Sequence, residues 1–283
     1  MSDLAWKILV CCHKQDIFAK QPPFYPIQVG KAISNIDLNI PGDDTGVNIS
    51  SKNSSFCELT GMYWAWKNLK DTDVIGLCHY RRYFDFYHQG RFGFPSTSFK
   101  TADFDSINLT IPDKIKKAVE SGSIVVTKPR YYRFPLYYDY CECHISDDIR
   151  SLNIIIQKTQ SKNIRDAFFK VFYQGNKLRH YNMFIMKWEQ FNQYCSWLFP
   201  LLGQVENAID ISHYNPTQKR IFGFMAERLF NVWIVATNQR VIEKPVIWIN
   251  EGYDNLGQYS LPRYVCRVAC NMVSNFLTRF RKL

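Results

Sequence analysis

The sequence lacks the long apolar stretches that mark membrane-spanning segments. No run approaches the ~18 consecutive apolar residues that a transmembrane helix needs. The first residues, MSDLAWK, also lack a basic leader followed by an apolar run, so no secretory signal is expected. These two absences favour a cytoplasmic protein, either free or attached to a membrane from its cytoplasmic side.

Paired cysteines are also lacking. The nine cysteines are odd in number, include no C-x-x-C pair and lie partly within apolar runs, which is typical of buried thiols in a reducing compartment and not of a disulfide framework. Cys141-x-Cys143-His144 is a possible zinc-binding fragment. No second ligand pair follows at a suitable spacing, so no metal site is expected from this pattern.

The composition is that of a folded protein with a basic surface. With 283 residues, 46% hydrophobic and 21% charged, the chain is long enough for one large domain with a small appendage and too apolar for extended disorder. The net charge of +10 indicates an anionic partner, which composition leaves open between nucleotide, lipid headgroup and nucleic acid. Aromatic residues at 16% favour a ring-shaped ligand, although an aromatic core explains the same excess.

The segment from 53 to 84 combines a capped helix, a turn and a buried strand. Ser55 and Glu58 have the spacing of a capping box, so we expect a helix to begin near Ser55. Its buried face is predicted by apolar residues three and four positions apart, which are Phe56, Leu59, Tyr63 and Trp66. Residues 74–78 are a short apolar run, typical of an inner strand covered on both faces.

Basic residues follow three predicted strands. Residues 74–78 lead into His79-Tyr80-Arg81-Arg82, residues 7–12 lead into His13-Lys14, and residues 123–127 lead into Lys128. Ligands of α/β sheets bind outside the carboxyl ends of the strands, and paired guanidinium groups bind phosphate oxygens without a metal. The cluster therefore predicts an anion site. The alternative is that the arginines form salt bridges on a surface loop.

The remaining segments are predicted to be helices, strands or loops. Helices are predicted at 115–119, 147–157, 163–173, 188–202 and 217–236, and further strands at 182–186 and 246–250. Proline and glycine indicate loops at 15–44 and at 85–112, the second being a possible mobile flap. Residues 131–140 are aromatic and interrupted by proline, so they are predicted to form an irregular wall against which a sugar ring could stack.

Several polar residues are candidates for catalysis or binding. Asp139, Glu142 and His144 follow the aromatic wall and are residue types that act as general bases. Glu227 lies on a mostly apolar helix, where a carboxylate is costly unless it pairs with an arginine or has a function. The polar stretch 48–53, ending at Asn53, precedes a helix and could bind a phosphate or a sugar hydroxyl, or simply cap the helix.

The C-terminal segment has no acidic residue after Asp254. Tyr264, Val268, Met272, Phe276 and Phe280 form one helical stripe, with basic residues placed off it. This pattern predicts a basic amphipathic helix at 262–283 that lies on an anionic membrane surface. Packing against the body of the protein is the alternative.

Six blocks of sequence carry a resemblance to a known family. They read NISSKN at 48–53, CELTGMYWAW at 57–66, GLCHYRRYF at 76–84, DYCECH at 139–144, NMFIM at 182–186 and RIFGFMAERL at 220–229. In this order they resemble the signature segments of a bacterial domain-of-unknown-function family. Its genes belong to capsule and O-antigen (lipopolysaccharide) synthesis, and it includes galactofuranosyltransferases. The resemblance implies a GT-A-type glycosyltransferase domain at 1–255, an α/β sandwich around a mixed, mostly parallel sheet.

The chain departs from the GT-A pattern at one point. Such enzymes usually carry Asp-x-Asp after the strand at 74–78, where it holds Mn²⁺ or Mg²⁺ on the donor diphosphate, whereas this chain has His79 to Arg82. A divalent metal is therefore disfavoured, and Arg81 and Arg82 are predicted to neutralise the leaving diphosphate.

The resemblance and the residues together give an expected function. A hexose such as galactofuranose is transferred from a UDP-sugar to a hydroxyl of a lipid-linked glycan, with inversion, at the cytoplasmic face of the inner membrane. Donor-binding residues are predicted to be His13, Lys14, Asn53, His79, Tyr80, Arg81 and Arg82. Catalytic candidates are Glu227, then Asp139 and Glu142, and acceptor-binding candidates are Tyr137, Tyr138, His144 and Asn182. The alternative is a non-catalytic binding module for anionic glycan or nucleic acid; the aromatic residues lack the regular spacing of a nucleic-acid-binding face.

Overall fold

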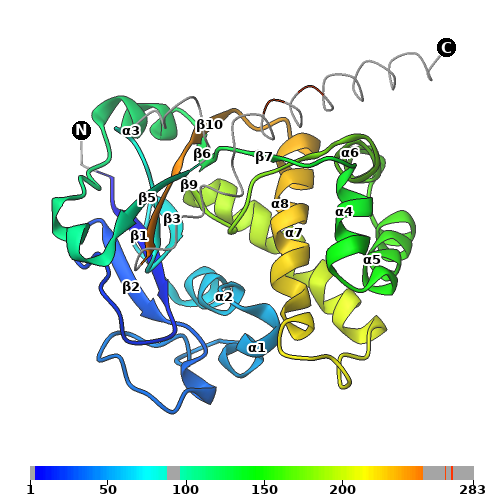
Figure 1. Cartoon of the computed structure of the whole chain (residues 1–283), viewed down its shortest axis with the longest axis horizontal. Helices are drawn as coiled ribbons and strands as arrows, with labels where there is room; N and C mark the ends of the chain where they lie inside the picture. The colour runs from blue at the N-terminus through cyan, green and yellow to red at the C-terminus, as the bar shows by residue number, and fades with distance from the viewer. Residues whose placement is uncertain (1–3, 88–95, 251–264, 266–268, 270–283) are drawn as a thin grey trace.

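A computed structural model describes residues 4–87 and 96–250, together with residues 265 and 269. The described chain is an α/β fold built on one nine-stranded mixed sheet, with most of the helices packed against one face of it (Figure 1). The strands of this sheet are β1 (Trp6–Cys12), β2 (Phe24–Gln28), β3 (Val74–His79), β4 (Arg82–Phe84), β5 (Ser96–Lys100), β6 (Ile124–Thr127), β9 (Phe184–Lys187), β10 (Val241–Lys244) and β11 (Val246–Asn250). A two-stranded ribbon joins β7 (Arg130–Tyr131) to β8 (Lys177–Leu178).

Strand β3 lies at the centre of the sheet. It pairs in parallel with β1, antiparallel with β9 and, through His79 and Arg82, antiparallel with β4. The described sheet contains four parallel pairings (β1–β2, β1–β3, β6–β10, β5–β11) and four antiparallel ones (β3–β4, β3–β9, β6–β9, β4–β11). The prediction of a mixed sheet is confirmed, but the expectation that it is mostly parallel was wrong.

The order of the strands requires the sheet to curl. Going from β10 through β6, β9, β3 and β4 to β11 takes five strand-to-strand steps, which would span ~24 Å in a flat sheet. Yet β10 and β11 are consecutive in the chain and separated only by Pro245. The sheet therefore rolls until these two strands lie close together, which makes its carboxyl-end edge concave.

Both faces of the sheet are buried because apolar residues run without alternation along its inner strands. In β1, Leu9 and Cys11 face one apolar core while Ile8 and Val10 face a second. Helix α3 (Asp113–Glu120) covers the second core, and the other helices build the first. These are α1 (Asn53–Phe56), α2 (Leu59–Asn68), α4 (Leu136–Cys143), α5 (Ser146–Thr159), α6 (Lys162–Phe169), α7 (Trp188–Ala208) and α8 (Ile221–Ala236).

Strong apolar patterns gave correct elements. The strands at 7–12, 74–78, 123–127 and 246–250 are confirmed as β1, β3, β6 and β11, and the strand at 182–186 is confirmed as β9 with a two-residue shift of its start. The helices at 115–119, 147–157, 163–173, 188–202 and 217–236 are confirmed as α3, α5, α6, α7 and α8. Beyond α6, residues 170–174 continue as a short π-helix.

Three loop predictions were wrong. The segment 15–44 contains β2, an edge strand paired only with β1, where Pro26 is tolerated because it needs no partner on the outer side. The segment 85–112 contains β5, which pairs with β11, and a short 3₁₀ helix. The aromatic stretch 131–140 becomes α4 from Leu136, because Pro135 is compatible with a helix start.

The capping-box prediction was also wrong. The chain turns at Cys57, where φ is +52°, and this splits the expected helix into α1 and α2. Ser55 donates its hydroxyl to the Lys52 carbonyl, and Glu58 accepts a hydrogen bond from Asn182. Of the predicted buried face, Phe56 and Leu59 are in the core, while Tyr63 and Trp66 are half-buried against Phe199 of α7.

Two sequence predictions lie outside the described residues. They are the C-terminal amphipathic helix, apart from Val265 and Ala269, and residues 88–95 of the expected flap. Within the described parts of the chain, no helix is both long and apolar enough to span a membrane.

Candidate functional site

A cavity of about 1070 Å³ opens at the concave edge of the sheet, between the strand ends and helices α1, α4 and α8. Because β1 and β3 are parallel, their carboxyl ends bring His13 and the segment from His79 to Arg82 to one wall. Helix α8 provides Phe224, Glu227 and Arg228 to the lining of the same cavity. The position agrees with the rule that ligands bind at the carboxyl ends of the strands.

The two neighbouring arginines have different surroundings. Arg81 donates from Nε to Asp16 Oδ2 at 2.7 Å, and the Asp16 side chain is only 7% exposed. Arg82 instead lies with its guanidinium carbon 4.7 Å from the ring centres of both Tyr181 and Trp248. Its buried Nε has no hydrogen-bond partner, and no carboxylate of the described chain pairs with it. Arg82 is therefore the better placed of the two to bind an anion from outside.

More cationic and imidazole groups surround the same space. Lys219 and Arg220 reach it from the segment that leads into α8, and Arg220 donates from Nε to Cys57 Sγ at 3.4 Å. Burial lowers the pKa of His13 and of His79, and neighbouring cations lower both further. His79 is also held by its Nε2, which donates to the Tyr181 carbonyl at 2.8 Å. Both imidazoles are thus neutral at pH 7, and the positive charge of the cavity comes from the lysine and arginines.

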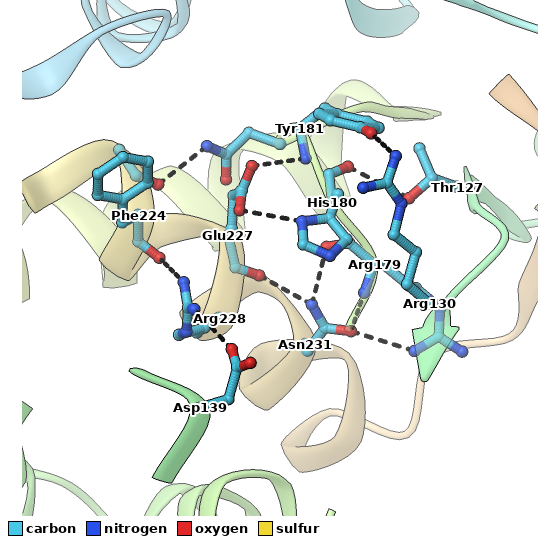
Figure 2. Close-up of polar contacts among 12 residues, drawn as sticks. Thr127, Arg130, Asp139, Arg179, His180, Tyr181, Phe224, Glu227, Arg228 and Asn231 are labelled. Carbon is cyan, nitrogen blue, oxygen red and sulfur yellow. Dashed lines mark hydrogen bonds and ion pairs between the residues drawn. The ribbon is translucent and has the colours of Figure 1, made fainter. Parts of the chain in front are cut away.

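Glu227 is held by its neighbours on the turn before β9 (Figure 2). Its Oε1 accepts from the Tyr181 backbone N–H at 2.8 Å, and its Oε2 lies 3.4 Å from His180 Nδ1. Burial raises the pKa of Glu227, but the contact with His180, the charge of Arg228 and the Tyr181 N–H outweigh it and bring the pKa to about 2. Glu227 is therefore ionised, and its partners are an imidazole and a backbone N–H, not the arginine that was one of the two expectations.

A second carboxylate of the cavity, Asp139, is paired with an arginine. Arg228 Nη2 lies 3.5 Å from Asp139 Oδ2, and its Nη1 donates to the Phe224 carbonyl at 3.0 Å (Figure 2). The guanidinium also packs over the Tyr140 ring, 4.9 Å from its centre. Burial lowers the pKa of the nearby His144 to about 4, with Arg228 as a further cause. Asp139 and His144 both line the cavity from the α4 side.

The turn that carries His180 has a strained backbone. Tyr181 and Asn182 have φ values of +75° and +51°, in the left-handed region that bulky side chains rarely adopt. Besides the two bonds to the Tyr181 backbone, the turn is held by Asn231 of α8, which bonds the backbone of Arg179, and by Asn182, which donates to Glu58 Oε1 at 2.7 Å. Such strain is found mainly at functional sites, where the surrounding structure maintains it.

Most of the residues predicted from the sequence line this cavity. The residues that do are His13, Asn53, His79, Tyr80, Arg81, Arg82, Asp139, His144 and Glu227. Five lie elsewhere: Lys14 is near the Tyr80 ring, Glu142 and Tyr138 are exposed, Tyr137 stacks on Tyr173, and Asn182 is buried behind the wall. The functional roles of all these residues remain predictions.

Sequence reasoning missed several residues of the cavity. Glu58 was assigned to a helix cap, and His180, Tyr132 and Trp248 were not singled out. His180-Tyr181 repeats the dipeptide His79-Tyr80, which is a signal that could have been used. It lies before β9, and the antiparallel pairing of β9 with β3 brings the start of β9 to the carboxyl end of β3.

The cavity does not resemble a metal site. No group of three His, Cys, Asp or Glu side chains within the described ranges is arranged to hold a metal ion. Of the carboxylates that line it, Asp139 is paired with Arg228, Glu227 accepts from the Tyr181 N–H, and Glu58 accepts from Asn182. The described residues of the cavity therefore do not fit the diphosphate-bound metal of GT-A enzymes.

Comparisons with known proteins agree with the sequence resemblance. A solved structure titled as the apo form of WbbM, a bifunctional glycosyltransferase, matches with a TM-score of 0.78 and 31% identity over 87% of this chain. The match covers 45% of the WbbM chain, so this protein corresponds to less than half of that one. No curated protein matches. The model of the family described as Domain of unknown function (DUF4422) matches residues 7–239, and the chain belongs to that family.

Proposed function

We propose that the protein is a glycosyltransferase that moves a hexose such as galactofuranose from a UDP-sugar to a hydroxyl of a lipid-linked glycan, with inversion. The likeness to WbbM, a bifunctional glycosyltransferase, supports the reaction class. The sugar, the acceptor and the stereochemistry rest on the sequence resemblance. On the same basis we propose that the product is used in capsule or O-antigen synthesis. We also propose that the protein acts at the cytoplasmic face of the inner membrane.

The observation that carries the proposal is the distribution of charge in the cavity. The cationic residues of the cavity, here called the cationic wall, are Arg82, which pairs with no carboxylate of the described chain, Lys219 and Arg220; the carboxylate wall is formed by the ionised Glu227 and by Asp139. In glycosyl transfer the leaving diphosphate gains negative charge while the acceptor hydroxyl loses a proton. A cavity that presents both fixed cations and carboxylates matches both needs.

The cationic wall would bind the donor. Arg82 presents a planar guanidinium, which binds two phosphate oxygens at once, and its contacts with the rings of both Tyr181 and Trp248 fix the direction in which it points. Arg81 would contribute less, because Asp16 already occupies its Nε. The diphosphate charge would thus be neutralised by side chains in place of a metal ion.

The carboxylate wall would bind the acceptor. The His144 ring is tilted by 32° against the Phe224 ring, with ring centres 4.3 Å apart, and both line the cavity beside Asp139 and Arg228. Aromatic faces stack on the apolar C–H surface of a sugar, and the charged pair can bond its hydroxyls. The exposed Tyr138 and the stacked Tyr137 lie outside this wall, so an acceptor contact there would involve a longer glycan.

The test is a transfer assay with a panel of UDP-hexoses and a short soluble glycan acceptor, with product detected by mass spectrometry. A product heavier than the acceptor by one hexose, formed with only one or two of the donors, is the expected result. If the protein binds the glycan but forms no product with any donor, it is a non-catalytic binding module and the proposal fails. Product linkage, determined by NMR, then tests inversion separately.

A further inference from the structure

Three side chains of the cavity form a continuous chain of polar contacts. The Tyr132 hydroxyl lies 2.6 Å from His180 Nε2, and His180 Nδ1 lies 3.4 Å from Glu227 Oε2. All three residues line the cavity. Tyr132 follows β7, His180 follows β8 and Glu227 belongs to α8, so three segments of the chain converge on one imidazole.

The direction of this chain follows from the chemistry of its ends. Glu227 is ionised and can only accept, so His180 must carry its hydrogen on Nδ1. The Nε2 atom then has a free lone pair and accepts from the Tyr132 O–H. A phenol, a neutral imidazole and a carboxylate in this order resemble a nucleophile–histidine–acid triad, in which a base is oriented by a third group.

The imidazole is fixed from several directions. Thr127 donates its hydroxyl to the His180 carbonyl at 3.2 Å. On either side, Arg179 N–H donates to Asn231 Oδ1 and Tyr181 N–H donates to Glu227, so the backbone on both sides of His180 is tied to α8 (Figure 2). The strained φ of Tyr181 is maintained by these bonds. A structural histidine needs no such framework, whereas a proton-transfer group must keep its orientation.

We propose that Tyr132, His180 and Glu227 form a proton relay that removes the proton of the acceptor hydroxyl. The proposal rests on the glycosyltransferase function. As the acceptor oxygen bonds to the sugar and the diphosphate leaves, the acceptor O–H bond breaks and its proton passes to the Tyr132 oxygen. The original Tyr132 proton passes to His180 Nε2 at the same time. The imidazolium that results is stabilised by Glu227, and its proton returns to solvent after product release.

Direct proton removal by Glu227 is less favourable on two grounds. Oε1 accepts from the Tyr181 N–H and Oε2 faces His180, so each oxygen of the carboxylate already has a partner in the protein. A carboxylate whose pKa is about 2 is also a weak base. The ordinary pKa of an imidazole lies closer to neutral pH, so an imidazole is the better proton acceptor. In this assignment Glu227 is a positioning residue that acts through His180, and Tyr132 is the group that contacts the acceptor.

Charged groups around the relay set its pH dependence. Burial lowers the pKa of His180, Glu227 raises it, and Arg130 and Arg228 lower it. Asp139 acts on the phenol, since after burial it is the next cause that raises the Tyr132 pKa. The relay requires neutral His180, so kcat should be constant above pH 6.5 and fall on the acid side.

The deciding experiment compares Tyr132→Phe with the control Tyr131→Phe in the full chain. Tyr131 is the neighbouring phenol and does not line the cavity. Tyr132→Phe should lower kcat for transfer by about 100-fold, within the range for lost acid–base catalysis, with the Kd for UDP changed less than twofold. Tyr131→Phe should match the wild type in both. If Tyr132→Phe keeps the kcat of the wild type, the relay is wrong. If the wild type itself transfers no sugar, the proposed function is wrong.

Two further readouts separate a relay from a structural role. In mixtures of H₂O and D₂O, the wild-type kcat should depend on the D₂O fraction in the curved manner expected when two protons move in the same step. The kcat of Tyr132→Phe should depend on it linearly, as expected for one proton. Glu227→Gln removes the negative charge that raises the His180 pKa, so the acid limb of its kcat profile should move to lower pH. A wild-type kcat that depends linearly on the D₂O fraction, or an unmoved acid limb in Glu227→Gln, contradicts the relay.

Discussion

Arg82→Ala should weaken binding of UDP far more than Arg81→Ala. The Arg82 guanidinium has no carboxylate partner in the described chain and lies over two aromatic rings, so its charge is available to a ligand. A charge-assisted contact contributes about 1.5–3 kcal/mol, which corresponds to a 10- to 150-fold increase in Kd when it is removed. Arg81 already bonds Asp16, so its removal should raise the Kd by less than about 10-fold.

The two substitutions should differ in their effect on stability. Arg81→Ala leaves the Asp16 carboxylate, 7% exposed, without its ion-pair partner, which costs about 1–3 kcal/mol of the free energy of unfolding. Arg82→Ala loses two cation–π contacts but also removes a partly buried charge that has no counter-ion among the described residues. These effects oppose each other, so the free energy of unfolding should change by less than about 1 kcal/mol.

Isothermal titration calorimetry with UDP and urea denaturation measure the two quantities on the same preparations. Arg82→Lys is the matched variant, because it keeps the charge but loses the planar fork, and its Kd should fall between those of the wild type and Arg82→Ala. Equal Kd values for wild type and Arg82→Ala, with both proteins folded, would refute the assignment of Arg82 to the diphosphate.

Three further predictions follow from the same structure and one from the tail sequence. The folded-state pKa of Glu227, about 2, lies below the ordinary value of 4.5, so the ionised Glu227 stabilises the folded state above pH 4.5. This stabilisation is lost as the pH falls from 4.5 toward 2. The difference in the free energy of unfolding between wild type and Glu227→Gln, measured by urea denaturation, should therefore shrink between pH 4.5 and pH 2 and be constant above pH 4.5. NMR titration should give His144 a pKa near 4, rising toward 6.5 in Arg228→Gln, and an unchanged value would exclude Arg228 as a cause. EDTA should leave transfer nearly unchanged; loss of activity that Mn²⁺ or Mg²⁺ restores would contradict charge neutralisation by arginine. Removing residues 263–283 should abolish sedimentation with anionic liposomes and spare turnover of a soluble acceptor, unless the segment belongs to the core.

The sequence correctly predicted the elements whose apolar residues show that they are buried. β1 and β3 are unbroken apolar runs because both faces of the sheet are covered, and α8 is long and apolar because it lies in the core. β2 and β5 have no such signal. Each gains its strand conformation from one neighbour, β1 or β11, and that pairing is a property of the tertiary structure.

The site was predictable where residues follow parallel strands. His13 and Arg82 meet because β1 and β3 end at the same edge. His180 could not be placed in this way, because it precedes β9, and only an antiparallel β9 brings it to that edge. Glu58 was assigned to a local cap, and Asn182 of the strained turn binds it instead.

The most direct test of the central claim is release of UDP from UDP-hexoses by the wild-type protein and by Arg82→Ala. The cavity should release UDP slowly from its donor without acceptor and faster when a glycan acceptor is added. At donor concentrations below KM, Arg82→Ala should be at least about 10-fold slower in both conditions. If the wild type releases no UDP from any donor with or without acceptor, or if Arg82→Ala releases it at the wild-type rate, the assignment of this cavity to nucleotide-sugar transfer is contradicted.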